Sequence, residues 1–390
     1  MNLNKEILTS EIQEFITNYN KDISKLAFAG SPFEKVTVQE LIQQIESRNK
    51  IEKKLPTWFQ TKNIFYPPKL NLEQTSSEIT AKYKASIING NTIADVTGGF
   101  GIDSYYFSEK FKNVQHFEIN NYLSEIATYN FSVLQKKNIQ CFKEDGLQQV
   151  QKNQYDVIYI DPSRRNDLKG KVFLLKDCLP NVPGHLDSVL FHCKQLLIKT
   201  SPMLDISLGL NELKYISEIH IVAVNNEVKE LLWLAEKGFK NTPKIKTRNF
   251  NKTTIEKFDF NLGDESHTEY SEPLKYIYEP NASILKSGAF NLVSERYNVQ
   301  KLHKNTHLFT SDELVDFPGR RFIINTTIPY SKKEIKIFLN MKKANITIRN
   351  FPESVSNIRK KLKISDGGDD YLFFTTTGTN IKIILVCSKV

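Results

Sequence analysis

Residues 93–103 of the chain read Ile93-Ala94-Asp95-Val96-Thr97-Gly98-Gly99-Phe100-Gly101-Ile102-Asp103. The pattern is that of a short apolar strand, a glycine-rich turn and the beginning of a helix. Glycines in such a turn permit positive φ angles and let a ligand approach the backbone closely. The helix that follows has unbonded N–H groups in its first turn. Because strand-to-helix turns also use glycine for shape alone, the stretch needs support from its neighbours before it identifies a ligand site.

The next three apolar runs support a ligand site, because each has an acidic residue near its end. These residues are Glu118 in Val114–Ile119, Asp145 (followed by Gly146) after Ile139–Phe142, and Asp161 (followed by Pro162) after Tyr155–Ile160. Ligands of open α/β sheets bind beyond the carboxyl ends of the strands. We therefore expect the glycine-rich turn and the three acidic strand ends to lie at one edge of a parallel sheet.

Apolar runs alternate with helical patterns from Ile88 to about Leu262, which favours βαβ units and an α/β fold. The expected strands are Thr92–Val96, Val114–Ile119, Ile139–Phe142, Tyr155–Ile160, Leu196–Ile198 and Ile219–Val224, with a helix over Tyr122–Lys137. The apolar spacing also predicts a helix over Glu227–Phe239. An antiparallel hairpin of Lys244–Phe250 and Ile255–Leu262 is expected to end this part of the chain.

The chain is long enough for several domains. We expect an N-terminal helical segment (1–85), the α/β domain (86–265), a polar linker (263–273), and two small α+β domains (274–330 and 331–390). In the last of these, Ser331 and Glu334 have the spacing of a capping box, which predicts a helix ending near Lys343.

The order and spacing of the four strand ends resemble class I S-adenosylmethionine-dependent methyltransferases. The resemblance implies a Rossmann-like, seven-stranded sheet and S-adenosylmethionine as the cofactor. It assigns the methionine part of the cofactor to the first strand end and its turn: Asp95, Thr97, Gly98, Gly99, Phe100 and Gly101. It assigns the ribose to Glu118 and the adenine amine to Asp145, with Gly146 beside it. A dinucleotide-binding oxidoreductase is disfavoured, because Asp95 and Asp103 flank the turn where a pyrophosphate would lie.

The fourth strand end reads Asp161-Pro162-Ser163-Arg164-Arg165. By the resemblance, Asp161 and Pro162 are candidate catalytic residues, and the following three residues are candidates for substrate binding. Asp-Pro is similar to the motif of enzymes that methylate exocyclic base nitrogens, but Ser163 and Arg164 depart from it. Asp-Pro-x-Arg is similar to uridine C5 methyltransferases, but their cysteine nucleophile is missing after the fifth strand, where the chain reads Lys199-Thr200-Ser201-Pro202-Met203. The two arginines either bind a phosphate or form ion pairs with nearby aspartates.

The whole chain also resembles bacterial methyltransferases that carry ferredoxin-like and THUMP-like domains at the C-terminal side. The matching stretches are Gln74–Glu78, Tyr278–Lys286, Arg349–Pro352 and Leu362–Leu372. THUMP domains bind RNA, usually tRNA, so the resemblance implies an RNA partner. The Gly367-Gly368-Asp369-Asp370 stretch is read as a turn between a helix and a strand rather than as a nucleotide-cyclase site.

The charge of the chain is compatible with a polyanionic partner. Lys and Arg total 53 and Asp and Glu total 44, a formal net charge of +9, and cations near phosphates release condensed counterions. One helix face carries Arg359, Lys360 and Lys361, which are candidate RNA contacts, although a solvated face is the ordinary reading of such a cluster.

The remaining features exclude several classes of protein. None of the four cysteines lies in a CxxC pair, so neither a zinc site nor a disulfide framework is expected. No apolar run is long enough to cross a membrane, and the first residues do not resemble a signal peptide. We therefore expect a cytoplasmic methyltransferase that modifies a base in tRNA or rRNA. A methyltransferase of proteins or small molecules and a non-catalytic RNA-binding protein are the alternatives.

Overall fold

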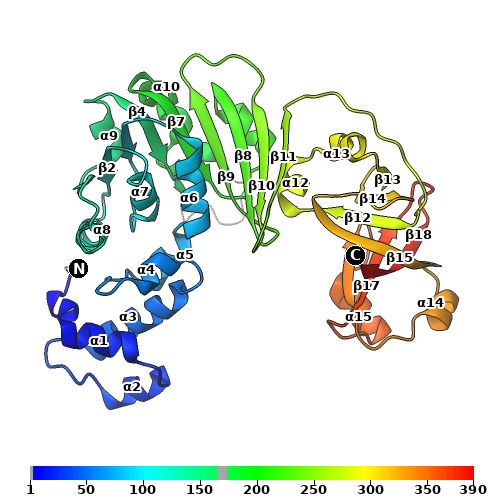
Figure 1. Cartoon of the computed structure of the whole chain (residues 1–390), viewed down its shortest axis with the longest axis horizontal. Coiled ribbons are helices and arrows are strands. Elements are labelled where there is room, and N and C mark those ends of the chain that lie inside the picture. The colour runs from blue at the N-terminus through cyan, green and yellow to red at the C-terminus, as the bar shows by residue number, and fades with distance from the viewer. Residues whose placement is uncertain (1–2, 165–173) are drawn as a thin grey trace. The chain divides into compact units, whose positions relative to one another are not determined.

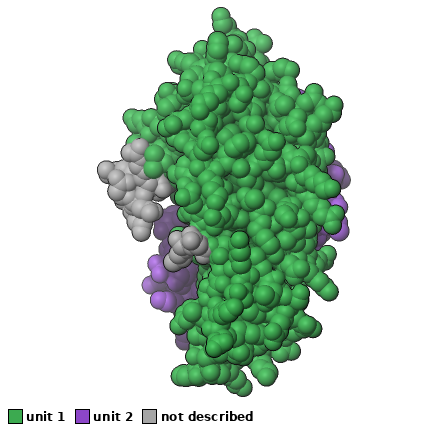
Figure 2. Space-filling model, turned by 90° about the vertical axis from the view of Figure 1, so that its left-hand side faces the viewer, with its two compact units in different colours: residues 1–219, 231–241 green, residues 220–230, 242–390 purple. Residues whose placement is uncertain are grey.

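The computed structural model describes residues 3–164 and 174–390 (Figure 1). The chain forms two compact units, one of residues 1–219 and 231–241 and the other of residues 220–230 and 242–390 (Figure 2). The boundary between the two units passes through two neighbouring strands, β8 (Ile216–Val224) and β9 (Glu227–Glu236).

The first unit begins with the predicted helical segment. Its helices are η1 (Lys5–Leu8), α1 (Ser10–Asn18), α2 (Ile23–Ala29), α3 (Val38–Ile51), α4 (Pro56–Gln60), α5 (Lys69–Gln74) and α6 (Glu78–Ile87). The longest of them, α3, starts with a capping box in which Thr37 and Glu40 satisfy each other's backbone N–H groups. Trp58 of α4 is completely buried and packs on Phe100, with 4.8 Å between the ring centroids. This packing joins the helical segment to the domain that follows.

The α/β domain contains the predicted parallel strands. They are β1 (Thr92–Asp95), β2 (Asn113–Phe117), β3 (Ile139–Phe142), β4 (Tyr155–Ile160) and β7 (Cys193–Thr200). The helices between and after them are α7 (Ile102–Phe107), α8 (Asn121–Val133), α9 (Gly146–Val150), η3 (Leu175–Asp177), α10 (Val182–Phe191) and α11 (Ile206–Glu212). A short antiparallel pair, β5 (Ser163–Arg164) and β6 (Cys178–Leu179), follows β4.

The main sheet has the strand order β11-β10-β8-β9-β7-β4-β1-β2-β3. β1 pairs in parallel with β2 and β4, β2 with β3, and β4 with β7, whereas β9 runs antiparallel to β7. Seven of these strands, β1–β4 and β7–β9, form the expected Rossmann-like sheet. The predicted terminal hairpin is confirmed as β10 (Lys244–Phe250) and β11 (Ile255–Asn261).

The helix predicted over Glu227–Phe239 is wrong, because this segment forms β9. Leu231–Ala235 is an uninterrupted buried run, and such a run does not distinguish a strand covered on both faces from a buried helix. The missed signal is the dipeptide Asn225-Asn226 between β8 and β9. Both asparagines have positive φ angles, 49° and 63°, as a two-residue hairpin turn requires.

The second unit contains a seven-stranded sheet in the order β13-β14-β12-β15-β18-β17-β16. Its strands are β12 (Tyr276–Pro280), β13 (Gln300–His303), β14 (Thr306–Ser311), β15 (Gly319–Pro329), β16 (Asn345–Arg349), β17 (Asp370–Thr376) and β18 (Lys382–Lys389). Its helices are α12 (Ala282–Ser287), α13 (Phe290–Tyr297), α14 (Lys332–Phe338) and α15 (Val355–Leu362). Two apolar clusters form its core, one around Phe322 and Phe373 and one around Ile358 and Phe374.

One boundary in this unit differs from the sequence expectation. Ser331 caps α14 as predicted, accepting the N–H of Glu334 at 3.2 Å, but the helix ends at Phe338 rather than near Lys343. The four cysteines are free thiols. In the described part of the chain, no helix has the length and apolarity needed to cross a membrane.

Candidate active site

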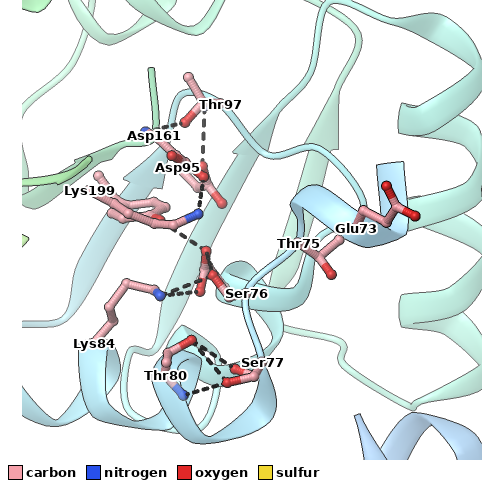
Figure 3. Close-up of polar contacts among 12 residues, drawn as sticks. Glu73, Thr75, Ser76, Ser77, Thr80, Lys84, Asp95, Thr97, Asp161 and Lys199 are labelled. Atoms are coloured by element: carbon pink, nitrogen blue, oxygen red, sulfur yellow. Dashed lines mark hydrogen bonds and ion pairs between the residues drawn. The ribbon is translucent and has the colours of Figure 1, made fainter. Parts of the chain in front are cut away.

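The strand order of the sheet reverses between β1 and β4. From β1 the chain adds β2 and β3 on one side, while β4 and β7 lie on the other side. In open α/β sheets such a reversal opens a crevice at the carboxyl ends of the strands. The loops after the two strands meet there, because the backbone N–H of Asp161 donates to the Thr97 hydroxyl at 2.7 Å (Figure 3).

Asp95, at the end of β1, is directed into the loop that follows it. The residue is 1% exposed, and its carboxyl group accepts hydrogen bonds from the Thr97 N–H at 3.2 Å and the Ser104 hydroxyl at 2.7 Å. Burial raises the pKa of Asp95 to about 8, the Ser104 hydrogen bond opposes this, and the neighbouring Asp103 and Asp161 add to it. The geometry therefore makes Asp95 an organiser of the glycine loop rather than an exposed group.

The glycine loop fits tightly over the side chain of His116. A Cβ atom on Gly98 would lie 2.3 Å from the His116 Nε2 atom, so no larger residue fits there without a shift. Gly99 and Gly101 both have positive φ angles, and Gly101 precedes α7. The His116 ring is completely buried, which lowers its pKa to about 4 and keeps it neutral near pH 7.

The second and third strand ends also carry carboxylates. Glu118 contacts the glycine loop directly, and Asp145 precedes Gly146, which packs against the end of β1. Glu118 accepts the Gly99 N–H at 2.8 Å and the Asn120 N–H at 2.7 Å. Asp145 caps α9 by accepting the Leu147 N–H at 2.9 Å. Gly146 is needed for contact with the first strand end, because a Cβ atom there would lie 2.6 Å from the Val96 Cα atom.

The fourth strand end pairs Asp161 with a residue that the sequence expectations did not include. The Lys199 ammonium, at the end of β7, contacts Asp161 Oδ2, and the side chains are 13% and 32% exposed, respectively. Lys199 follows the apolar run of the fifth strand directly, so it was recognisable as another charged strand end. Lys84 of α6 was also missed. It pairs with Asp103 at 3.3 Å although it is completely buried.

Asp103 is turned into the protein interior. Its Oδ2 atom accepts hydrogen bonds from the Ser76 hydroxyl at 2.8 Å and the Tyr159 hydroxyl at 2.9 Å. Burial raises the pKa of Asp103, but the ammonium groups of Lys84 and Lys199 and the hydrogen bonds from Ser76 and Tyr159 together hold this pKa below its usual range. The carboxylates and ammonium groups at this edge therefore form one electrostatic cluster (Figure 3).

The structure describes some of the other residues predicted at the fourth strand end. Pro162 is buried, and the exposed Ser163 donates from its hydroxyl to the Leu179 carbonyl at 3.3 Å. The backbone of Arg164 lies in β5, and Arg165 lies outside the described residues. In the described part of the chain, no group of three or more His, Cys, Asp or Glu side chains could hold a metal ion.

A solved structure is similar to the chain over its whole length. It is the crystal structure of a presumed methyltransferase from Porphyromonas gingivalis W83, with 31% sequence identity, a TM-score of 0.88 and coverage of 100% of both chains. Family profiles for a ferredoxin-like domain and a THUMP-like domain match residues 276–318 and 319–389. The protein is a class I methyltransferase with a C-terminal THUMP-like domain.

Two further solved structures are similar to parts of this methyltransferase. One is a presumed Streptococcus mutans methyltransferase in complex with SAH, with 14% identity, a TM-score of 0.31, and coverage of 41% of this chain and 96% of that chain. The other is a presumed RNA methyltransferase from Pyrococcus horikoshii, with 13% identity, a TM-score of 0.34, and coverage of 49% and 98%. A search of the curated proteins found no match.

The three basic residues predicted to contact RNA are not equivalent in the THUMP-like domain. Arg359 donates to the carbonyl groups of Ala344 and Ile364 at 3.2 and 3.4 Å and pairs with Asp366. Lys361 bonds to the Tyr330 hydroxyl at 2.8 Å and lies 3.2 Å from a Glu353 oxygen. Lys360 is exposed. Arg359 therefore has a structural set of partners, while Lys360 faces solvent.

Proposed function

We propose that this methyltransferase transfers a methyl group from S-adenosylmethionine to a base of a structured RNA such as tRNA or rRNA. The main support is one juxtaposition. The glycine loop and the carboxylates of Glu118, Asp145 and Asp161 lie at the carboxyl edge of the same sheet, in a chain that also carries a THUMP-like domain.

The residues at this edge fit S-adenosylmethionine. Glu118 and Asp145 offer carboxylate oxygens, which accept hydrogen bonds from ribose hydroxyls and an adenine amine and have spare lone pairs beyond their backbone partners. A pyrophosphate would be repelled by the same groups. The glycines of the loop Gly98–Gly101 allow a ligand to approach the backbone closely. Asp95 fixes the loop by accepting the Thr97 N–H. We assign Glu118 to the ribose, Asp145 to the adenine amine, and the loop to the methionine part.

The chemistry needs alignment more than activation. S-adenosylmethionine supplies a methyl group that is already activated by a sulfonium. The protein must therefore hold the acceptor in line with the bond between the methyl group and sulfur. Such orientation of the reactants lowers the activation free energy. Asp161 is the group we assign to the acceptor. Lys199 occupies its Oδ2 atom, so Oδ1 is the oxygen that accepts a hydrogen bond from the acceptor base. Ser163, Arg164 and Arg165 follow Asp161 in the chain, where they are suited to hold the neighbouring phosphate.

The assignment to RNA is supported by charge and by domain composition. THUMP domains bind RNA, and the chain has a formal net charge of +9. The exposed Lys360 is the member of the predicted basic cluster that the geometry leaves most suited to a phosphate. Phosphate contacts of this kind act through counterion release, so RNA affinity should fall as salt rises.

The proposal is tested by mass spectrometry of nucleosides from tRNA and rRNA of a deletion strain and its parent. We expect one methylated nucleoside to disappear in the deletion strain and to return when the gene is restored. An unchanged nucleoside profile, together with S-adenosylmethionine-dependent methylation of a protein or small molecule, would favour the first alternative. RNA binding without any methyl transfer would favour the non-catalytic alternative.

A further inference from the structure

Lys84 belongs to the N-terminal helical segment, yet its side chain is completely buried. It lies on the face of α6 that also buries Ala81 and Ala85. Its ammonium is 3.0 Å from the Ser76 hydroxyl (Figure 3). The same ammonium is 3.3 Å from Asp103 Oδ1. A buried ion pair adds little stability over a well-packed apolar pair of the same volume, because desolvation offsets the attraction. The pair therefore suggests a role other than stability.

Asp103 connects Lys84 with the candidate active site. The hydroxyl of Tyr159 in β4 donates to Asp103 Oδ2 at 2.9 Å, and Asp161 follows Tyr159 by two residues. β7 pairs with β4 so that Leu197 lies opposite Tyr159 and Ile198 opposite Ile160, which brings Lys199 beside Asp161 at the strand ends. In agreement with this placement, the ammonium groups of Lys84 and Lys199 both lower the pKa of Asp103 against the effect of burial. Lys199 also contacts Asp161 at the fourth strand end. Four charges of alternating sign therefore lead from Lys84 through Asp103 and Lys199 to Asp161, and they come from α6, α7, β7 and the loop after β4.

We propose that Lys84 is a positioning residue of the methyltransferase site: it neutralises Asp103, and Lys199 consequently remains on Asp161. The inference rests on the proposed function in one respect, namely that Asp161 faces the methyl acceptor. It makes the N-terminal helical segment a part of the site and not only a cover for the sheet.

The physical reason is competition between two carboxylates for one ammonium. Coulomb attraction is strong where water is excluded, and Asp103 is buried whereas the Asp161 side chain is 32% exposed. Without the charge of Lys84, Asp103 draws Lys199 toward itself. Asp161 then loses the contact that fixes its Oδ2 atom. If the charge of Asp103 is removed as well, the competition ends and Lys199 returns to Asp161.

Crystal structures of Lys84→Met and of the double variant Lys84→Met/Asp103→Asn test this competition without any substrate. We expect the contact between the Lys199 ammonium and Asp161 Oδ2 to be lost in the single variant and present in the double variant. Lys82→Met is the matched control, since Lys82 lies in the same helix with a side chain that is 57% exposed and paired with Glu78. A single variant in which Lys199 still contacts Asp161 would overturn the proposal.

Methyl transfer from labelled S-adenosylmethionine to RNA of the deletion strain gives a second readout. Lys84→Met should lower the rate by about tenfold or more, the double variant should recover to within about threefold, and affinity for S-adenosylhomocysteine should stay within about threefold throughout, as expected for coupled neighbours that do not touch the cofactor. A double variant as slow as the single variant would contradict the proposal, because a merely structural Lys84 predicts no recovery.

The two readouts separate this inference from the proposed function. If the natural protein transfers no methyl group to RNA, the proposed function fails, while the crystal structures still decide the role of Lys84. If Lys84→Met does not fold, Lys84→Gln takes its place, because glutamine keeps a hydrogen-bond donor in the cavity but lacks the charge. The same two structural outcomes then apply.

Discussion

The backbone N–H of Asp161 donates to the Thr97 hydroxyl at 2.7 Å, and this bond joins the glycine loop after β1 to the strand end that carries the proposed acceptor residue. An equivalent bond exists at the opposite end of the same two strands, where the Asp156 N–H donates to the Thr92 hydroxyl at 3.0 Å. The two threonines therefore occupy similar structural positions, one at the candidate active site and one far from it.

Thr97→Val should impair methyl transfer more than Thr92→Val does. Each substitution leaves one backbone N–H without its acceptor, at a cost of about 1–3 kcal/mol of unfolding free energy. Only Thr97→Val should also misplace Asp161, so we expect its transfer rate to fall at least tenfold more than that of Thr92→Val. Thermal unfolding and the transfer assay, run on both variants, provide the measurement. Equal rates in the two variants would mean that the Thr97 bond is only structural.

Glu118→Ala should weaken binding of S-adenosylhomocysteine by ~1–3 kcal/mol, because ribose hydroxyls lose their acceptor and the Gly99 N–H loses its partner. Isothermal titration calorimetry measures this loss directly. Glu125→Ala is the control. Glu125 lies in α8, its side chain is 36% exposed, and it pairs with Lys143. If Glu118→Ala binds as tightly as the control, Glu118 does not hold the ribose.

The buried His116 should make the protein less stable in acid. Its folded-state pKa of about 4 lies below the ordinary value of 6.5, so the unfolded chain binds more protons than the folded protein between these pH values. The stability of the natural protein relative to His116→Phe should therefore fall by roughly 2–4 kcal/mol as the pH falls from 6.5 to 4.

Urea unfolding at several pH values measures this difference, and the exposed His185 provides the control variant His185→Phe. If the free energies of unfolding of the natural protein and of His116→Phe change in parallel with pH, the folded and unfolded chains bind a proton at His116 equally well. That result would contradict a lowered pKa of His116 in the folded protein.

Arg359 and Lys360 should respond differently to substitution. Arg359→Ala removes bonds to two carbonyl groups and to Asp366, so it should destabilise the THUMP-like domain by about 1–3 kcal/mol. Lys360→Glu should leave the melting temperature unchanged and reduce the slope of log affinity against log salt by about 1 in filter binding to tRNA. An unchanged slope for Lys360→Glu would mean that this face does not contact RNA.

The sequence was sufficient to predict the strand ends because their pattern is local. Glycines, acids and apolar runs follow one another along the chain, so the edge that carries Thr97, Glu118, Asp145 and Asp161 could be placed without coordinates. β9 was missed because its buried run Leu231–Ala235 has no polar alternation, and only the Asn225-Asn226 turn before it indicated a hairpin.

The electrostatic cluster could not be predicted in the same way. Lys84 pairs with Asp103 and Lys199 with Asp161, and these partners are brought together only by the packing of α6, α7, β4 and β7. A lysine on a short helix ordinarily faces solvent, and nothing in the spacing distinguishes Lys84 from Lys82 except that it shares a face with Ala81 and Ala85. The tertiary fold decides which of the two lysines is buried.

The most direct test of the central claim is methyl transfer by the purified protein from labelled S-adenosylmethionine to RNA extracted from the deletion strain, with Asp161→Ala as the paired variant. We predict label in one nucleoside of tRNA or rRNA with the natural protein. With Asp161→Ala we predict none, while its affinity for S-adenosylhomocysteine stays within about threefold, because Asp161 is assigned to the acceptor and not to the cofactor. Absence of label from all RNA, in a protein that binds S-adenosylhomocysteine, would contradict the claim that RNA is the substrate.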